Sequence, residues 1–195
     1  EETEMRPTTP YGINKAAARW MVQAYRERYG IFASNAILFN HESPLRKREF
    51  VTRKISHGVA EIKHGLRSNI ELGCLDAKRD WGYAGDFVEA MWKMLQTETP
   101  DDFVIGTGQT HSIEDFAAAA FRHVGLDWHE HVSTNPAFIR TNDQGVLSAD
   151  CSKAEQILDW TPSTSFNDLV AMMVDADMQS VAASTSQAST ARRAA

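Results

Sequence analysis

The chain has 195 residues, of which 43% are hydrophobic and 24% charged, so it can bury one substantial core but is short for two domains of ordinary size. Its 20 Lys and Arg against 26 Asp and Glu give a formal net charge of −6, which argues against nucleic acid or an anionic membrane surface as a partner. No stretch reaches the ~20 apolar residues of a membrane helix, and the two cysteines are far apart in the sequence, so we expect a soluble cytoplasmic protein without a disulfide framework or a thiolate zinc site.

The first predicted helix covers residues 11–29. Residues 1–10 show no periodicity and are predicted to be a loop. Apolar side chains then recur at helical spacing, and Gly30 supplies a C-terminal stop. The next run, residues 31–39, is short and apolar, which predicts a strand buried on both faces, as in a parallel sheet.

Helices and strands alternate along the rest of the chain. The predicted helices cover residues 50–64, 85–97, 112–125, 152–160 and 165–178. The predicted strands cover residues 69–73, 102–108, 128–132 and 146–150, with a loop at 133–145. Ser112 and Asp115 form a variant of the capping box at the start of one helix. This alternation predicts an α/β fold with a mostly parallel sheet.

Part of a dinucleotide-binding sheet is expected to be missing. The first predicted element is a helix, and the sequence has neither a Gly-x-Gly-x-x-Gly nor a Gly-x-x-x-x-Gly-Lys loop. We therefore expect residues 1–10 to arrive from a missing N-terminal half, and a strand edge to be exposed around residues 31–39. Residues 180–195 have low complexity and are expected to form a disordered tail.

Tyr11 and Lys15 are four residues apart and therefore share one face of the first predicted helix. A free tyrosine ionises near pH ~10, so a tyrosine that acts as a base at neutral pH needs its phenolate stabilised by about 4 kcal/mol. A lysine one helical turn away supplies part of that stabilisation. The same spacing is common on ordinary surface helices, so the pair alone does not identify an active site.

Four segments carry further information when they are taken together. They are YGINK at 11–15, ILFNHESP at 37–44, FVTRKI at 50–55 and LDAKRDWGYAGDFVEAMWKMLQ at 75–96. In this combination the chain resembles the GDP-mannose 4,6-dehydratase family of the extended short-chain dehydrogenase/reductase superfamily, as far as about Asp177. The Tyr-x-x-x-Lys pattern is shared by the whole superfamily, whereas FNHESP, FVTRKI and LDAKRDWG are specific to the dehydratases.

The resemblance implies a fold. Residues 11–179 are expected to form the C-terminal part of an incomplete, Rossmann-like, doubly wound NAD(P)-binding sheet. A small α/β region that binds the nucleotide sugar is expected to be interleaved with it. The sequence departs from the family pattern at Leu45, at Lys47 and again at Gly145.

The resemblance also implies a role for each matching residue. Tyr11 is the catalytic phenol that faces the sugar 4-hydroxyl, and Lys15 binds the nicotinamide ribose and lowers the pKa of the tyrosine. The residues that contact NADP are Tyr11, Lys15, His41 and Arg46. Four residues face the GDP-sugar, and two of them are cations suited to a diphosphate. These four are Asn40, Lys54, Arg79 and Arg140.

Outside the resemblance, the same polar residues have ordinary structural explanations. Asn40 and His41 are typical of a polar turn at a strand end. Arg79 and Asp80 could form a surface ion pair worth ~0–1 kcal/mol, and residues 46–48 could be a solvated charged loop. These explanations stay open until the positions of the side chains are known.

A metal site is not expected. His129 and His131 would share one face of the predicted strand at residues 128–132. A zinc site needs at least three protein ligands, and no third ligand accompanies the two histidines. The resemblance likewise implies no metal, with NADP as the cofactor.

The activity implied by the resemblance is that of a lyase in nucleotide-sugar metabolism leading to GDP-fucose, in a homo-oligomer. It converts GDP-mannose to GDP-4-keto-6-deoxymannose with internal hydride transfer through NADP. The family's glycine-rich loop and its catalytic Thr and Glu lie further upstream of the tyrosine than the ten residues present here, so we expect a partial copy that is inactive alone. The alternatives are a noncatalytic remnant that binds a nucleotide sugar, and a related nucleotide-sugar epimerase.

Overall fold

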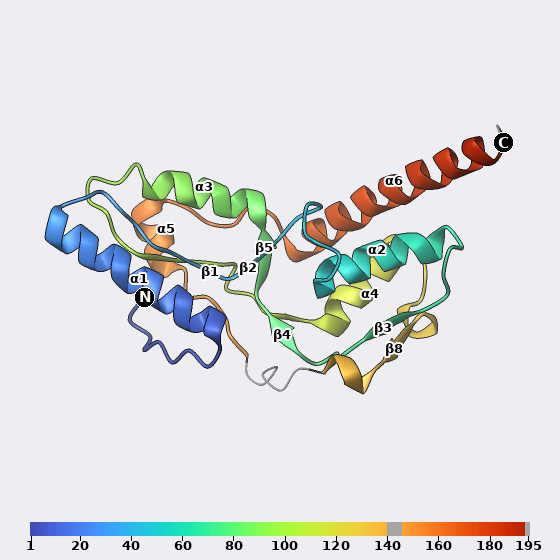
Figure 1. Cartoon of the computed structure of the whole chain (residues 1–195), viewed down its shortest axis with the longest axis horizontal. Helices are drawn as coiled ribbons and strands as arrows, with labels where there is room; N and C mark the ends of the chain where they lie inside the picture. Colours follow the sequence, from blue (N-terminus) through green and yellow to red (C-terminus); the bar gives the residue numbers. More distant parts are fainter. Residues whose placement is uncertain (140–145, 194–195) are drawn as a thin grey trace.

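The computed structural model describes the backbone of residues 1–139 and 146–193, and the side chains of those residues as far as Ser186. The molecule is elongated and consists of two lobes that lie side by side (Figure 1). The α1 lobe is built from α1 (Pro10–Tyr29), β1 (Ala36–Leu38), α3 (Ala84–Met94), β6 (Phe103–Ile105) and α5 (Ser152–Leu158). The α2 lobe is built from α2 (Val51–Lys63), β3 (Ile70–Leu72), α4 (Ile113–His123), β8 (Val132–Thr134) and α6 (Phe166–Arg193).

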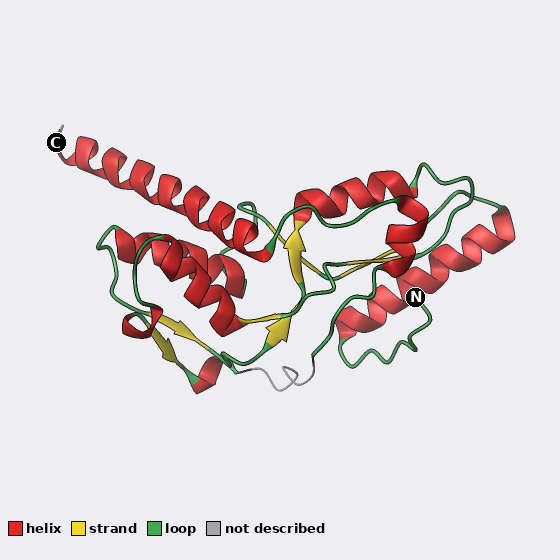
Figure 2. Ribbon diagram, turned by 180° about the vertical axis from the view of Figure 1, so that it is seen from behind, coloured by secondary structure: helices red, strands yellow, loops and turns green. Residues whose placement is uncertain are grey.

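Four short strands lie where the lobes meet. They are β2 (Asn40–Glu42), β4 (Lys78–Arg79), β5 (Trp81–Tyr83) and β7 (His111–Ser112). The chain passes from one lobe to the other several times, so neither lobe is a continuous stretch of sequence (Figure 2).

The described strands form four two-stranded ladders, of which three are parallel, so the predicted α/β fold with mostly parallel strands is confirmed. The pairs are β1–β6, β2–β5 and β3–β8, while β4–β7 is antiparallel. Only Phe39 separates β1 from β2. Its N–H donates to the Ile105 carbonyl at 2.9 Å, which continues the ladder with β6 by one residue. The neighbouring strand thus changes from β6, which pairs with β1, to β5, which pairs with β2, within a few residues.

The buried apolar side chains of the described residues form two clusters, one in each lobe. The cluster of the α1 lobe packs Phe87 of α3 against Phe103 of β6 and Trp160 after α5. The cluster of the α2 lobe is formed by α2, α4 and α6 together with Ile70 and Trp81. The single core expected from the chain length is thus divided in two.

Helix α1 starts and ends as the sequence predicts. The Thr9 hydroxyl caps the first turn by accepting a hydrogen bond from the Gly12 N–H at 3.1 Å. Gly30 ends the helix in the left-handed region at φ 62°, which a glycine adopts without strain. Ala16 is the one residue of α1 that is buried.

Polar contacts therefore contribute much of what holds α1 in place. The buried Asp102 carboxylate accepts hydrogen bonds from Arg19 Nε at 3.1 Å and Arg26 Nη1 at 2.9 Å. Asn35 donates to the same carboxylate from its side chain at 2.9 Å. Burial opposes ionisation of Asp102, but the hydrogen bonds from Asn35, Arg26 and Arg19 outweigh it and lower the pKa. The charged form thus ties the helix to the start of β6.

The most apolar predicted strand is shorter and less buried than expected. Strand is limited to β1 at residues 36–38, and all three of its residues are half-buried rather than buried on both faces. Ile31 and Phe32 are 43% and 46% exposed, which agrees with the expected exposed apolar edge. The described part of the chain pairs β1 with β6 alone, so one side of the strand is left without a neighbour.

Two further predictions of strand are wrong. Residues 128–130 form a 3-10 helix, η1 (Trp128–Glu130), because the Asp127 side chain caps it through the His129 N–H. The strand β8 begins only at Val132, and a second 3-10 helix, η2 (Pro136–Phe138), follows it. Residues 146–150 have no regular structure.

The predicted disordered tail is helical as far as the structure describes it. Helix α6 continues through this segment to Arg193. Alanine is the best helix former, and this segment is rich in it. The hydroxyls of Ser184 and Thr185 also donate to the carbonyls four residues earlier, at 2.9 Å each. The prediction of a disordered tail gave too little weight to the helix propensity of these alanines.

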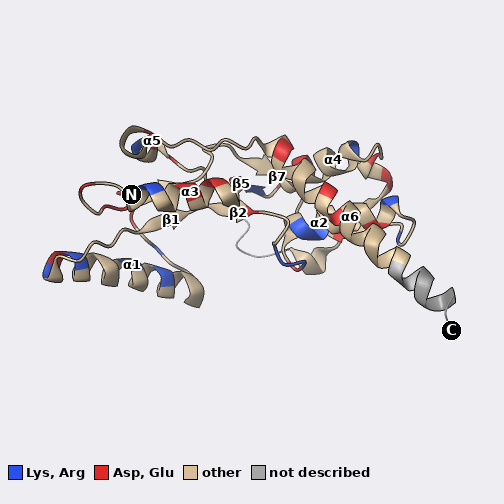
Figure 3. Ribbon diagram, turned by 90° about the horizontal axis from the view of Figure 1, so that it is seen from above, with Lys and Arg blue, Asp and Glu red and all other residues tan. Residues whose placement is uncertain are grey.

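Lys and Arg outnumber Asp and Glu on α1 and on α2, whereas α4 begins with acidic and ends with basic side chains (Figure 3). Over the described ranges, no helix combines the length and the apolar character that a membrane span requires.

Candidate active site

One cavity lies between α1 and β1 and has a volume of about 640 Å³. We call it the Tyr11 cavity, because Tyr11 and Lys15 of α1 and His41 of β2 line it. Lys15 Nζ lies 5.6 Å from the centre of the Tyr11 ring, one helical turn away. The Tyr11 residue is 72% exposed, so its phenol is open to a ligand that enters this cavity.

His41 is held in the wall of the Tyr11 cavity by contacts on two sides. Its Nδ1 lies 3.0 Å from the Phe39 carbonyl, and the tautomer that donates there leaves Nε2 as an acceptor. Its ring lies 5.3 Å from the ring of Phe87. His41 pairs with Gly82 of β5, where a Cβ atom would come within 2.4 Å of Phe87. Gly82 therefore lets the phenyl ring pack closely enough to support the imidazole.

The second cavity, the Lys54 cavity, has a volume of about 410 Å³ and lies between β2 and the start of α2. Its lining includes the predicted residues Asn40, Arg46, Lys54 and Arg79. Lys54 Nζ lies 4.1 Å over the Phe138 ring. Burial lowers the pKa of Lys54, while Glu71 raises it and Arg67 lowers it further. A partly desolvated cation of this kind binds an anionic group strongly.

A buried acid lies beside Arg46 in the wall of the Lys54 cavity. Glu42 is 2% exposed, and its carboxylate accepts a hydrogen bond from the Thr52 hydroxyl at 2.7 Å. Arg46 Nε lies 3.2 Å from the same carboxylate. Burial raises the pKa of Glu42, against the opposing effects of Thr52, Arg46 and His41. The ion pair between Arg46 and Glu42 thus holds the Arg46 guanidinium in the wall of the Lys54 cavity.

Successive side chains of β2 point alternately into the Lys54 cavity and the Tyr11 cavity. Asn40 and Glu42 line the Lys54 cavity, whereas His41 between them lines the Tyr11 cavity. Successive residues of a strand point to opposite faces. Of the four residues predicted to bind NADP, the structure therefore separates Arg46 from Tyr11, Lys15 and His41, because Arg46 shares its cavity with residues predicted to face the sugar nucleotide.

Arg140, the fourth residue predicted to face the sugar nucleotide, lies outside the described residues. The other predicted site residues all line one of the two cavities. Tyr11, Lys15 and His41 line the Tyr11 cavity, and Asn40, Arg46, Lys54 and Arg79 line the Lys54 cavity.

Asp80 does not act as the surface partner that its position next to Arg79 suggested. It is 1% exposed, and its carboxylate accepts four hydrogen bonds. The donors are the Thr107 N–H and hydroxyl at 2.9 and 2.6 Å, the Gly108 N–H at 2.9 Å and the Ala149 N–H at 3.1 Å. This carboxylate joins the segment that carries Arg79 to the loop after β6.

The two histidines considered as a metal pair have separate partners. His129 Nδ1 lies 2.7 Å from Asp127, and His131 Nδ1 lies 2.9 Å from the Ser68 carbonyl. His131 also stacks on Phe121, with the ring centres 5.5 Å apart. Among the residues with described positions, no group of three or more potential ligands gathers around one point.

Two residues that line the Lys54 cavity beside its cations, Glu42 and Phe138, were not among the predicted site residues. Glu42 follows His41 directly, and strand alternation would have placed it on the same face as Asn40. Phe138 carried no such signal, because η2 brings it under Lys54 from a distant part of the chain.

Comparison with known proteins gives consistent results. The family model described as GDP-mannose 4,6 dehydratase matches residues 1–173. GDP-mannose 4,6 dehydratase 1 of Arabidopsis thaliana is 48% identical over 179 residues, which are 92% of this chain and 50% of that protein. The human GDP-mannose 4,6 dehydratase is 45% identical over an alignment of 196 positions. That alignment covers 92% of this chain and 53% of that protein. The chain thus spans about half the length of the curated relatives it matches.

Solved structures resemble the chain in fold. The structure of RMD from Pseudomonas aeruginosa complexed with NADPH aligns with a TM-score of 0.83 and 19% identity, covering 92% of this chain and 59% of that one. A dTDP-glucose 4,6-dehydratase from Bacillus anthracis in complex with NAD aligns with a TM-score of 0.75 and 20% identity, covering 90% and 54%. At this level of identity the two alignments show the fold alone.

Proposed function

The chain belongs to the GDP-mannose 4,6-dehydratase family, and from this premise we propose that its residues form one half of a site that dehydrates GDP-mannose. The product is GDP-4-keto-6-deoxymannose, so the activity is that of a lyase. The observation that carries the proposal is the pairing of Tyr11 and Lys15 in one cavity, with a second, cationic cavity across β2.

Tyr11 is proposed as the group that takes the proton from the sugar 4-hydroxyl. Lys15, with its ammonium 5.6 Å from the centre of the Tyr11 ring, is proposed as the cation that accompanies the phenol in the reaction. The exposure of Tyr11 supports this role, since the hydroxyl must reach a substrate rather than a neighbouring side chain.

The Tyr11 cavity suits the nicotinamide end of NADP. Its volume of about 640 Å³ is in the range of cofactor pockets, and Lys15 and His41 offer polar contacts along its wall. NADP supplies the hydride acceptor and donor when it is bound, which the amino acid side chains cannot do. Lys15 and His41 would hold that end of the cofactor against Tyr11, and Arg46 is proposed as a contact to another part of it.

The Lys54 cavity is proposed to receive the GDP-sugar. Lys54 and Arg79 are the cations that a diphosphate requires, and Asn40 offers an amide at the end of the cavity nearest β2. Arg140 is proposed as a further contact to the same ligand.

These 195 residues contain no glycine-rich dinucleotide loop. We therefore expect the chain, incubated by itself with GDP-mannose and NADP, to give no keto sugar detectable by chromatography of the nucleotide sugars. A fusion of residues 1–195 behind the N-terminal half of the Arabidopsis relative is expected to form the product. Product from the chain alone would contradict the expected division of the site between two halves, and a folded fusion without product would contradict the proposed activity.

The noncatalytic alternative retains the Lys54 cavity but does not use the Tyr11 cavity. A remnant of this kind would bind GDP-mannose, and its fusion with the N-terminal half would not turn it over. The epimerase alternative predicts a product of unchanged mass from the same fusion. Chromatography coupled to mass spectrometry thus separates all three functions.

A further inference from the structure

The FVTRKI segment contains a charged residue, Arg53, to which the proposed function assigns no role. Lys54 points into the cavity, whereas Arg53 next to it turns to the loop before the helix and to α6. We propose that Arg53, fixed by Asp177 of α6, is a positioning residue that holds the loop of residues 43–50, and with it Arg46, against the Lys54 cavity. The proposal relies on the proposed function for the identity of the ligand only.

Arg53 holds this loop, which we call the Arg46 loop, by its backbone. Its Nη1 atom donates to the Pro44 carbonyl and, at 3.1 Å, to the Arg46 carbonyl. The two carbonyls lie two residues apart, so a single guanidinium nitrogen fixes the bend between them. A loop of polar residues without regular structure gains its definition from such contacts.

Asp177 fixes the position of the Arg53 guanidinium from the opposite side. It is 0% exposed, and its two carboxylate oxygens lie 3.0 and 2.8 Å from Arg53 Nε. The Ser56 hydroxyl donates to the same carboxylate at 2.6 Å. A buried ion pair persists when its remaining hydrogen-bonding capacity is satisfied, as it is here. Residues 124 positions apart in sequence thus meet between α2 and α6.

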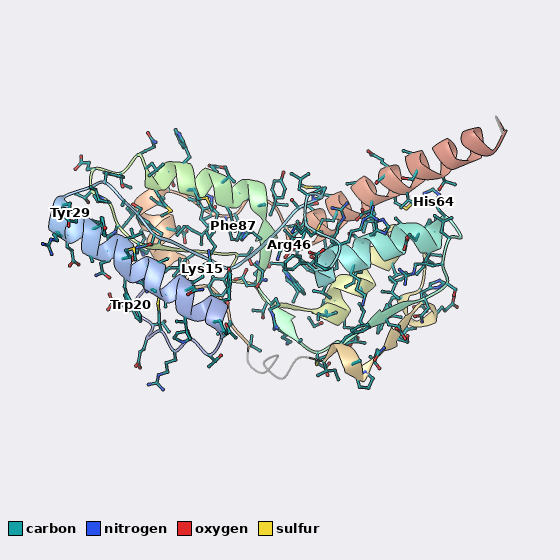
Figure 4. All side chains as sticks on the ribbon, viewed as in Figure 1. Lys15, Trp20, Tyr29, Arg46, His64 and Phe87 are labelled. Carbon is teal, nitrogen blue, oxygen red and sulfur yellow. The ribbon has the colours of Figure 1, made fainter. Side chains whose placement is uncertain are left out.

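The side chain of Arg46 is fixed in turn by the loop. Its guanidinium lies 3.6 Å from the centre of the Phe50 ring, and its Nε lies 3.2 Å from the buried Glu42. Phe50 belongs to the same loop, and its carbonyl accepts from the Lys54 N–H at 2.8 Å. Figure 4 shows Arg46 close to where the two lobes meet, near the start of α2. A shift of the Arg46 loop would therefore move this guanidinium away from the cavity wall.

The competing explanation is that Arg53 and Asp177 merely stabilise the packing of α2 on α6. Arg53→Lys separates the two roles, because an ammonium can pair with Asp177 but cannot also fork onto both carbonyls. Ser56→Ala is the matched control, since it weakens the same α2–α6 contact without touching the loop. Asp177→Asn provides a second test from the other end of the contact.

Hydrogen exchange measured by NMR or mass spectrometry on the full chain reports the loop directly. In Arg53→Lys we expect the amides of residues 45–50 to exchange at least about tenfold faster, while residues 55–62 of α2 keep their rates. Ser56→Ala should leave the loop within about twofold of the wild type. Asp177→Asn should accelerate the loop in the same way as Arg53→Lys.

The proposal is overturned if Arg53→Lys leaves the exchange of the loop unchanged, or if Ser56→Ala accelerates the loop as strongly as Arg53→Lys does. Titration of the N-terminal fusion with NADP, the ligand that Arg46 is proposed to contact, is the second readout and is followed by calorimetry. A loss of affinity of about tenfold is expected for Arg53→Lys relative to Ser56→Ala. If the wild-type fusion fails to bind NADP, the proposed function is contradicted, and the exchange rates still decide the positioning role.

Discussion

Tyr11→Phe is expected to lower the turnover of GDP-mannose by roughly 10²–10⁴-fold in the fusion that carries residues 1–195 behind the N-terminal half of a relative. Phenylalanine retains the ring but lacks the hydroxyl that would take the proton from the sugar. Because Tyr11 is 72% exposed, we expect the circular dichroism spectrum and the melting temperature to be unchanged. Turnover is measured by chromatography of the nucleotide sugars at saturating substrate.

Tyr25→Phe is the matched control for this substitution. Tyr25 lies on the same helix and is 51% exposed, but it does not line the Tyr11 cavity. It should retain the wild-type rate. Equal rates for the Tyr11→Phe variant and its control would show that the Tyr11 hydroxyl takes no part in the reaction.

Asp80→Asn is expected to reduce the free energy of unfolding by about 3 kcal/mol, the largest stability effect that we predict. The carboxylate of Asp80 accepts four hydrogen bonds in a buried position, whereas an amide has a single acceptor oxygen. Its NH₂ group would face two of these donors, and each buried donor left unsatisfied costs about 1–3 kcal/mol. Urea unfolding followed by tryptophan fluorescence measures the change.

The control for this substitution is Asp76→Asn. Asp76 lies on the same segment and is exposed, so the change should stay within about 0.5 kcal/mol. If Asp80→Asn were as mild as Asp76→Asn, the hydrogen bonds of Asp80 could not be what joins the loop after β6 to the segment that carries Arg79.

Local patterns in the sequence were sufficient to predict helices α1 to α5 to within a few residues at each end. The capping box of Ser112 and Asp115 is present, with hydrogen bonds of 2.9 and 2.8 Å, and Gly30 ends α1 as expected. Such features depend on residues within one or two helical turns. They can therefore be predicted without knowledge of the rest of the chain.

The strands and the tail were harder to predict, because their structure depends on distant residues or on competing propensities. Residues 31–39 have the composition of a fully buried strand, yet their burial depends on neighbouring strands, and only β6 pairs with β1 in the described chain. The tail from Ser180 has the composition of a linker, but its alanines extend α6.

For the candidate site, too, local patterns could be predicted from the sequence and contacts between distant residues could not. Residues within the motifs could be selected from the sequence, and those with described positions line one of two cavities. The sequence could not place Arg46 apart from His41, because that separation depends on the alternation along β2 and on the Arg46 loop. Nor could it show that Arg53 meets Asp177 across α2 and α6.

The central claim is that Tyr11 and Lys15 serve a dehydration in which hydrogen moves from C4 to C6 of the same sugar. Its most direct test is mass spectrometry of the product that the fusion forms from GDP-mannose carrying deuterium at C4. We expect a keto sugar that has lost water and carries the deuterium at C6. Unchanged GDP-mannose, or a C4 epimer that has lost no water, would contradict it.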